Sequence, residues 1–307
     1  MASDDAALLS GSARLGVGTV QFGLAYGVTN RVGRVGLEEA ASILHFAREN
    51  DVVTLDTAAL YGDSEVTIGR AAAGMAFDIV TKTVKVSSEA SADTAADAII
   101  SRFERSISDL RVAQVDALMV HDAGDLLGCY GDRVWRCLHT IKVSGLARKI
   151  GASVYSGNEI DALLDRYDID IVQLPINAID LRLADGGQLD RLATRKVEVH
   201  ARSIFLQGLL LTPPEQLPAK FAALAPSLVQ MRQAFAGAGL TIMEGVLASV
   251  FRHQMIDRVI VGATSIREFR EVVSTANRLR AHQIDQASWR WPISDERLLN
   301  PALWGSL

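Results

Sequence analysis

The chain has 307 residues, of which 49% are hydrophobic and 22% are charged, a composition typical of a folded globular protein rather than a disordered one. The formal net charge is −5, from 31 lysines and arginines against 36 aspartates and glutamates. This mildly acidic balance, without a concentrated basic stripe, argues against nucleic acid or an anionic membrane surface as a partner.

Eight short segments rich in valine and isoleucine are typical of buried β-strands. They comprise residues 15–20, 52–56, 79–82, 117–121, 149–153, 169–174, 197–202 and 259–262. Segments with apolar residues at helical spacing separate them, as at Leu37, Ala40, Leu44 and Ala47. Eight alternating strands and helices in a chain of this length predict an α/β fold, a (β/α)8 TIM barrel, rather than an open sheet.

No break in composition divides the chain, so we expect a single domain. Residues 1–12 are expected to form a flexible lead-in, and residues 13–307 the barrel. A longer insertion, 212–237, follows the seventh strand. The tail from about residue 285, with Trp289, Trp291 and Trp304, is expected to pack over the barrel.

The N-terminus and the cysteines favour a reduced, cytoplasmic setting. The opening Met-Ala-Ser-Asp-Asp lacks the positive region and long apolar core of a signal peptide. No apolar run approaches the roughly 18 residues needed to span a bilayer. Cys129 and Cys137 form neither a disulfide framework nor a zinc-binding pattern. We therefore expect a cytoplasmic protein.

Polar residues stand at the ends of several predicted strands. The second strand ends at Asp56, the third at Lys82 and the fourth at His121. Active sites of such barrels form at the carboxyl ends of the strands. Because a buried, unpaired carboxylate is costly, we expect Asp56 and Lys82 to neutralise each other. A purely structural ion pair is the alternative for these two residues alone.

Tyr61 follows Asp56 in a short loop that is able to bring its phenol back over the barrel mouth. A phenol has a pKa near 10 and needs a neighbouring cation to exchange a proton near neutrality. We expect Lys82 to supply that charge and Asp56 to hold Lys82 in place. A neutral His121 imidazole would then hydrogen-bond a substrate oxygen and orient it.

These residues carry a resemblance to a known family. The stretch Asp56-Thr-Ala-Ala-Leu-Tyr61-Gly-Asp-Ser-Glu65, followed by Gly69, resembles the signature of the aldo-keto reductases. The opening Leu15-Gly-Val-Gly-Thr-Val-Gln-Phe-Gly23 is similar to the first strand of that family, and the resemblance extends over residues 13–277.

The resemblance implies a metal-free oxidoreductase that passes hydride between a nicotinamide dinucleotide and a small aldehyde, ketone or sugar, or the corresponding alcohol. It implies a catalytic tetrad in which Tyr61 is the general acid/base and Lys82 lowers its pKa. Asp56 would pair with Lys82, and His121 would orient the substrate. The lack of a Gly-x-Gly-x-x-Gly unit after the first strand agrees with this reading.

The resemblance also implies where the nicotinamide lies. Ser153 and Gln173 fall where the family holds the nicotinamide amide, although Val154 stands where many members have asparagine. Arg202 takes the position of a tyrosine that stacks on the nicotinamide in many members. A guanidinium is also able to stack on a flat ring, and a salt bridge at the barrel rim is the alternative for Arg202.

The eighth strand leads into a predicted helix through Gly262, Thr264 and Ser265. Helix N-terminal N–H groups favour a phosphate, although both hydroxyls also suit helix capping. Arg270 follows as a further candidate for cofactor binding. Glu268 occupies the position where NADP-preferring members usually place an arginine. The general preference of the family implies NADP(H) rather than NAD(H), with NAD(H) or dual use as the alternative.

Two alternatives from other functional classes stay open. The first is a non-catalytic, nicotinamide-binding regulatory subunit. The second is a barrel lyase that forms a Schiff base on Lys82, which would require a desolvated lysine without a carboxylate partner. We expect Phe22, Tyr26, Tyr155 and a tail tryptophan to line the substrate pocket.

Overall fold

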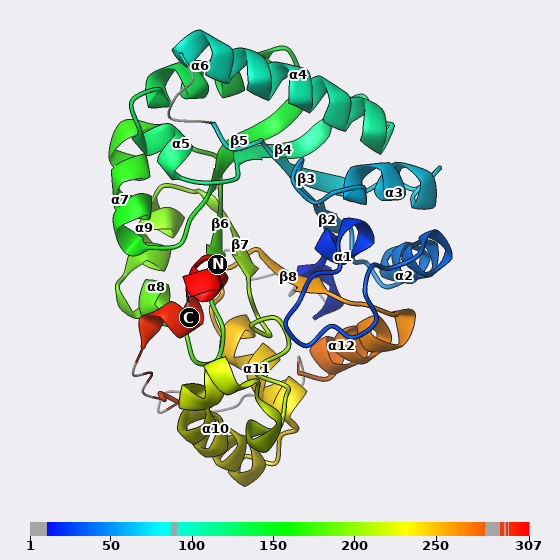
Figure 1. Ribbon diagram of the computed structural model, residues 1–307, viewed down its shortest axis with the longest axis vertical. Coiled ribbons are helices and arrows are strands. Elements are labelled where there is room, and N and C mark those ends of the chain that lie inside the picture. The colour runs from blue at the N-terminus through cyan, green and yellow to red at the C-terminus, as the bar shows by residue number, and fades with distance from the viewer. Residues whose placement is uncertain (1–10, 87–90, 280–288, 292, 294, 307) are drawn as a thin grey trace, which may run out of the picture.

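The computed structural model describes residues 11–86, 91–279, 289–291, 293 and 295–306. Eight parallel strands close into a barrel in sequence order, with β8 pairing to β1 (Figure 1). The strands are β1 (Leu15–Gly18), β2 (Thr54–Asp56), β3 (Asp78–Lys82), β4 (Val115–Val120), β5 (Ala147–Ser153), β6 (Ile171–Pro175), β7 (Glu198–Arg202) and β8 (Arg258–Gly262). The predicted (β/α)8 barrel is confirmed, and each predicted strand overlaps an observed one.

Helices surround the barrel on its outer side (Figure 1). The α-helices are α1 (Val20–Gly23), α2 (Leu37–Glu49), α3 (Ser64–Ala71), α4 (Ala92–Leu110), α5 (Gly124–Leu127), α6 (Gly131–Val143), α7 (Gly157–Arg166), α8 (Arg182–Asp185), α9 (Gln188–Thr194), α10 (Ala225–Gly237), α11 (Ile242–Phe251) and α12 (Ile266–Leu279). Short 3-10 helices are η1 (Ser12–Arg14), η2 (Pro214–Gln216), η3 (Ala219–Leu224), η4 (Glu296–Leu299) and η5 (Pro301–Ser306).

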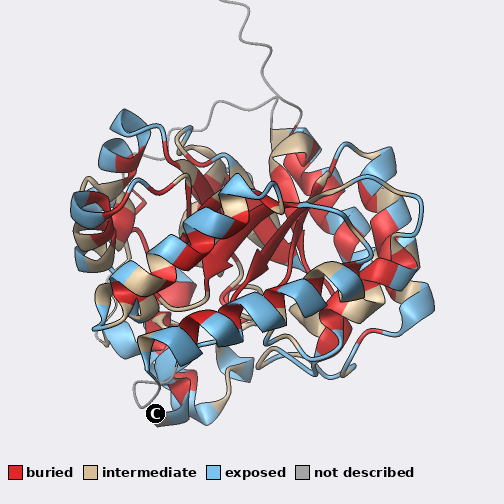
Figure 2. Ribbon diagram, turned by 90° about the horizontal axis from the view of Figure 1, so that it is seen from above, coloured by how far each residue is buried: buried red, intermediate tan, exposed pale blue. Residues whose placement is uncertain are grey.

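Local sequence explains where these elements begin and end. Every residue of β4 is buried, as expected for a strand covered by helices on one face and by the barrel interior on the other. Helix α4 begins at the N-cap Ser91, whose hydroxyl accepts a hydrogen bond from the Thr94 N–H, and ends at Arg111 in a left-handed conformation. Figure 2 shows the buried residues gathered in the strands and on the inner faces of the helices.

The register of the strands brings their polar ends together. Val80, Ala117, Met119 and Ile171 form a small buried cluster of their own, which we place in the barrel interior. Because side chains alternate along a strand, Lys82 extends on the same face of β3 as Val80. The pairing of Lys82 with Met119 and of Ser153 with Gln173 sets these carboxyl ends side by side.

Two predicted strands extend beyond the carboxyl ends of the observed ones. The first strand ends at Gly18 rather than at residue 20, because the Thr19 N–H bonds to the Asp56 carbonyl and Val20 begins α1. The fourth strand ends at Val120, so His121 lies one residue beyond it.

The insertion after β7 forms η2, η3 and α10, and the described part of the tail packs against it. Trp289 lies 4.9 Å from Phe235 of α10, and Trp304 lies 4.6 Å from Phe221 of η3, as measured between ring centroids. Residues 1–10 of the predicted lead-in, and residues 285–288, 292, 294 and 307 of the predicted tail, lie outside the described residues.

Among the described residues, no single helix has the length and apolar character needed to cross a membrane. Two consecutive segments, Ala219–Gly237 and Ile242–Phe251, are long and apolar enough for a membrane span only when taken together, and they are bent by 91° where they meet. Most residues of α11 are buried in the protein, and the apolar character of this helix fits a place in the core.

Candidate active site

A buried ion pair stands at the carboxyl ends of β2 and β3. Lys82 Nζ lies 2.5 Å from Asp56 Oδ1 and also donates to the Thr57 carbonyl at 3.0 Å. The two side chains are 1% and 6% exposed. Burial lowers the pKa of Lys82, and the Asp56 carboxylate opposes that shift. The expected pairing is therefore present, and it removes the condition that a Schiff-base lyase would need.

Tyr61 and His121 lie beside this pair. Their rings meet edge-to-face, 5.6 Å apart between centroids, and Lys82 Nζ is 5.3 Å from the centre of the Tyr61 ring. Within the described part of the chain, no hydrogen bond engages the Tyr61 hydroxyl, and Nδ1 of His121 is buried without a partner. Both groups are thus available to an oxygen atom of a bound molecule.

The electrostatics of Tyr61 differ from the sequence-based expectation. Burial raises the pKa of Tyr61, and the Asp56 carboxylate raises it further. Arg202 is the cation that opposes this rise, whereas Lys82 was expected to do so. Tyr61 therefore keeps its proton near neutral pH, as a general acid requires.

His121 is held in its neutral form. Burial lowers the pKa of His121 to about 4, and the nearby Lys82 ammonium contributes to the same shift. A neutral imidazole at pH 7 is able to donate a hydrogen bond to a carbonyl oxygen without adding a charge. The predicted neutral state of His121 agrees with this geometry.

The rest of the signature segment serves the fold. Ser64 bonds with Thr19 and Thr57 between the first two strand ends. The buried Glu65 carboxylate accepts hydrogen bonds from Thr81 at 2.6 Å and from Arg102 at 2.7 Å. These contacts fix the loop that carries Tyr61, so the motif joins Tyr61 to a structural frame.

A cavity of about 870 Å³ opens beside these residues. The predicted site residues that line it are Asp56, Tyr61, Lys82, His121, Ser153, Gln173, Arg202, Gly262 and Thr264. Ser265 and Arg270 are not among its lining residues. Of the expected pocket aromatics, Tyr26 and Tyr155 line the cavity, whereas Phe22 and the tail tryptophans do not. Within the described residues, no group of three or more His, Cys, Asp or Glu side chains is placed to hold a metal ion.

The residues predicted to hold the nicotinamide lie together on the floor of this cavity. Gln173 donates to Asp56 Oδ1 at 2.6 Å, and its buried Oε1 has no partner in the described chain. Arg202 donates to the Val154 carbonyl at 2.8 Å and lies over the Tyr155 ring at 4.1 Å. Among the described residues, no carboxylate forms a salt bridge with Arg202. The stacking of Arg202 on the nicotinamide stays a prediction.

In the strand-8 segment, Thr264 and Ser265 take part in helix capping, whereas their contact with a phosphate stays a prediction. Thr264 gives both its N–H and its hydroxyl to the Glu268 carboxylate, at 2.7 and 2.8 Å. Ser265 accepts from the Glu268 N–H at 3.3 Å and acts as a helix cap. Arg270 points away from the cavity and lies 4.3 Å from the Phe46 ring centre on α2.

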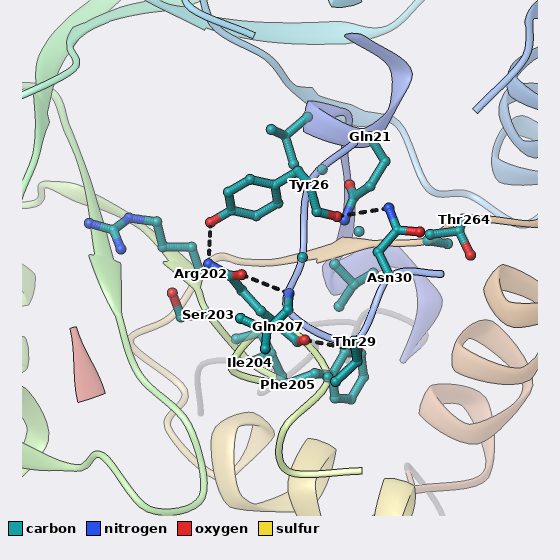
Figure 3. Close-up of a pocket in the computed structure, with 18 of the residues that line it drawn as sticks. Gln21, Tyr26, Thr29, Asn30, Arg202, Ser203, Ile204, Phe205, Gln207 and Thr264 are labelled. Carbon is teal, nitrogen blue, oxygen red and sulfur yellow. Dashed lines mark hydrogen bonds between the residues drawn. The ribbon is translucent and has the colours of Figure 1, made fainter. Parts of the chain in front are cut away.

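The sequence analysis did not identify two loops that meet at the cavity, one between α1 and α2 and the other after β7. The Gln207 side chain donates to Tyr26 Oη at 2.8 Å and accepts from the Val28 N–H at 3.1 Å (Figure 3). Thr29 donates to the Gln207 carbonyl. A side chain on Gly208 would collide with Thr29, so a glycine is needed where the loops meet. The available signal was Gln207-Gly208 following the seventh strand.

The loop that follows β7 carries backbone strain. Ser203, Leu206 and Gln207 all have positive φ angles, of 63°, 47° and 54°. Such conformations are costly for residues with a side chain and tend to gather at functional sites. All of them except Leu206 line the cavity.

A sequence profile described as the Aldo/keto reductase family matches residues 14–288. The chain belongs to this family. The resemblance carried by the Asp56–Glu65 stretch is thereby confirmed. A search of curated proteins found no match.

Solved structures with the same fold are distant in sequence. The aldo-keto reductase AKR11C1 from Bacillus halodurans, in its holo form, is 20% identical with a TM-score of 0.70, covering 89% of this chain and 94% of that one. The glycerol dehydrogenase AKR11B4 from Gluconobacter oxydans is 18% identical with a TM-score of 0.62 and the same coverage. An aldo/keto reductase from Klebsiella pneumoniae in complex with NADP and acetate is 17% identical with a TM-score of 0.62, covering 86% of this chain and 85% of that one.

Proposed function

We propose that this aldo/keto reductase interconverts a small aldehyde, ketone or sugar and its alcohol, with Tyr61 as the general acid/base. The observation that carries the proposal is the convergence of Tyr61, His121 and the Asp56–Lys82 pair on one cavity. Membership of the family supports a nicotinamide dinucleotide as the cofactor, and one neighbour of the same fold was solved with NADP.

The residues present fit a nicotinamide amide. Gln173 offers a buried, unpartnered Oε1, and Ser153 lies beside it in the strand register with its hydroxyl lining the cavity. An acceptor and a hydroxyl side by side match the donor and acceptor of a primary amide. Arg202 would lie next to this amide. When bound there, the dinucleotide would supply or take up the hydride.

The protein's own groups handle the proton. Tyr61 is protonated near neutrality because burial raises its pKa, so its hydroxyl is ready to donate to a carbonyl oxygen. Neutral His121 is placed to bond the same oxygen and hold it in one orientation. Lys82, held by Asp56, places a compensated ammonium next to the Tyr61 ring, where it would stabilise a developing phenolate.

The test compares Tyr61→Phe with Tyr155→Phe, a change of the same size at another tyrosine lining the cavity. Binding of NADH and NADPH is followed by quenching of tryptophan fluorescence, and turnover is measured on a panel of aldehydes, ketones and sugars. We expect Tyr61→Phe to lose about 10²–10⁴-fold in turnover, the usual contribution of acid–base catalysis, with little change in cofactor affinity. Tyr155→Phe should keep most activity.

Other outcomes are equally informative. Full activity in Tyr61→Phe would contradict the role of Tyr61. Tight cofactor binding by the unaltered protein without turnover on any compound would favour the regulatory-subunit alternative. Failure of a folded protein to bind either cofactor would contradict the proposed function as a whole.

A further inference from the structure

Charged side chains line the cavity on both sides. Figure 3 shows Arg202 and Thr264 on opposite sides. Arg202 belongs to the catalytic side, because its charge acts on the pKa values of Tyr61 and His121. On the Thr264 side, Glu268 and Glu271 of α12 line the cavity.

The N-terminus of α12 is already occupied by carboxylates. Glu268 accepts both the N–H and the hydroxyl of Thr264. Glu39 of α2 accepts the Ile266 N–H at 2.5 Å. A phosphate placed here would therefore find these two N–H groups taken and would face the carboxylates of Glu268 and Glu271, which line the cavity.

No arginine of α12 compensates for these charges. Arg270 is turned onto Phe46, and Arg267 does not line the cavity. Of the cations that do line it, Lys82 is paired with Asp56, and Arg202 lies on the catalytic side. Arg31, on the loop between α1 and α2, is the remaining lining cation among the described residues.

We propose that this protein prefers NAD(H) to NADP(H), because Glu268 and Glu271 receive an adenosine ribose and repel its 2′-phosphate. The inference rests on the proposed function, which places the nicotinamide at Tyr61 and so leaves the adenosine half to the Thr264 side. A carboxylate accepts hydrogen bonds from ribose hydroxyl groups, and in Rossmann folds an acidic residue beside the adenosine ribose binds its 2′-hydroxyl in NAD-binding sites. Glu268 and Glu271 offer the same chemistry from a different fold. Repulsion of the wrong ligand is a common source of such selectivity.

The experiment measures the dissociation constants of NADH and NADPH by fluorescence quenching. The proteins are the unaltered chain, Glu268→Gln, Glu271→Gln and a control, Glu244→Gln. Glu244 accepts hydrogen bonds from the N–H and the hydroxyl of Thr241, at 2.9 and 2.8 Å, as Glu268 does from Thr264. Unlike Glu268, Glu244 does not line the cavity. The control therefore separates the loss of a helix cap from the loss of a charge facing the ligand.

We expect the unaltered protein to bind NADH about tenfold or more tightly than NADPH, given the cost of opposing like charges. Glu268→Gln should shrink that ratio by about fivefold, mainly by tightening NADPH, as each tenfold corresponds to 1.4 kcal/mol. Glu244→Gln should leave the ratio unchanged. Because exposed charges are screened by salt, raising the ionic strength of the unaltered protein should also tighten NADPH relative to NADH.

Several results would overturn the preference. NADPH binding as tight as NADH in the unaltered protein is one, and an unchanged ratio in both Glu268→Gln and Glu271→Gln is another. A selective loss of NADPH binding in Arg31→Ala would show that Arg31 holds a 2′-phosphate. Binding of neither nucleotide would contradict the proposed function and the preference with it.

Discussion

The two ends of the barrel both hold ion pairs, but they hold them in different surroundings. At the amino ends of the strands, Lys149 of β5 bridges Asp116 of β4 and Glu198 of β7, at 3.1 and 2.6 Å, and Glu198 also contacts His200. At the carboxyl ends, Lys82 has the single carboxylate of Asp56. Only the carboxyl-end pair borders the large cavity.

The pKa of Lys149 is raised and that of Lys82 is lowered, because the two lysines differ in how far carboxylate partners offset burial. Burial lowers the pKa of Lys149, but its two carboxylate partners outweigh burial and the net shift is upward. Burial also lowers the pKa of Lys82, and there one carboxylate does not compensate. The amino end is thus built to keep its charges fixed, whereas the carboxyl end holds its groups in a balance suited to moving a proton.

Removing each lysine in turn tests whether the two ends of the barrel differ in this way. Lys82→Met leaves the buried Asp56 carboxylate without a cation, so we expect a loss of about 3–5 kcal/mol in the free energy of unfolding together with nearly all turnover. Lys149→Met acts on a side chain that is 32% exposed, and should cost only about 1 kcal/mol and leave turnover intact. Urea unfolding and steady-state kinetics measure both.

A double variant guards against simple unfolding of Lys82→Met. Replacing Asp56 with Asn in the same chain removes the stranded charge, so stability should recover in part while activity does not. Recovery of activity along with stability would show that Lys82 has only a structural role. A loss of turnover in Lys149→Met would erase the distinction between the two ends.

A smaller effect is expected from the arginines at each end. Arg202, at the carboxyl end of β7, opposes the raised pKa of Tyr61. Arg258, at the amino end of β8, bonds to Thr54 at 3.0 Å. Arg202→Leu should raise the pKa of Tyr61 further, and a rise of one unit would slow alcohol oxidation, which needs the phenolate, about tenfold at a given pH. Reduction, which needs the phenol, should be less affected.

The pH dependence of alcohol oxidation distinguishes an effect of the Arg202 charge on the pKa of Tyr61 from a loss of packing. In Arg202→Leu the rise of activity with pH should move to higher pH, whereas in Arg258→Leu it should stay in place. A uniform loss in Arg202→Leu, with an unmoved profile, would mean that Arg202 acts only through its contacts with Val154 and Tyr155.

The sequence predicted the barrel well because the strands have a simple physical signature. Buried parallel strands such as β4 are nearly continuous apolar runs, and the polar residues that end them stand out against that background. The ion pair of Asp56 and Lys82 followed from the cost of burying either charge alone. These inferences need only the order of residues along the chain.

The direction in which side chains point was harder to predict. The turn of Arg270 onto Phe46 and the capping of Thr264 by Glu268 depend on packing between helices. The contact of Gln207 with Tyr26 joins residues 181 positions apart, and no local pattern encodes it. The pKa shift of Tyr61 depends on how deeply its side chain is buried and on its closeness to the Asp56 carboxylate, and both require the folded structure.

The smallest expected effect concerns two histidines. Burial lowers the pKa of His121, near the cavity, and of His253, before β8 at the amino end, to about 4 in each case. An unfolded histidine titrates near 6.5, so between pH 4 and 6.5 the unfolded chain binds more protons than the folded one. The stability that each histidine contributes is therefore complete above pH 6.5 and is lost as the pH falls towards 4.

Replacing either histidine with glutamine should therefore flatten the dependence of stability on pH in the same window, by up to about one proton per site. Only His121→Gln should also change turnover and abolish the decline of activity towards pH 4, because only His121 faces the cavity. Urea unfolding at a series of pH values, with kinetics at the same values, separates the two effects. If His253→Gln changed the acid side of the activity profile as His121→Gln does, that decline would report the stability of the whole barrel. The neutral imidazole of His121 would then lose its assigned part in orienting the substrate.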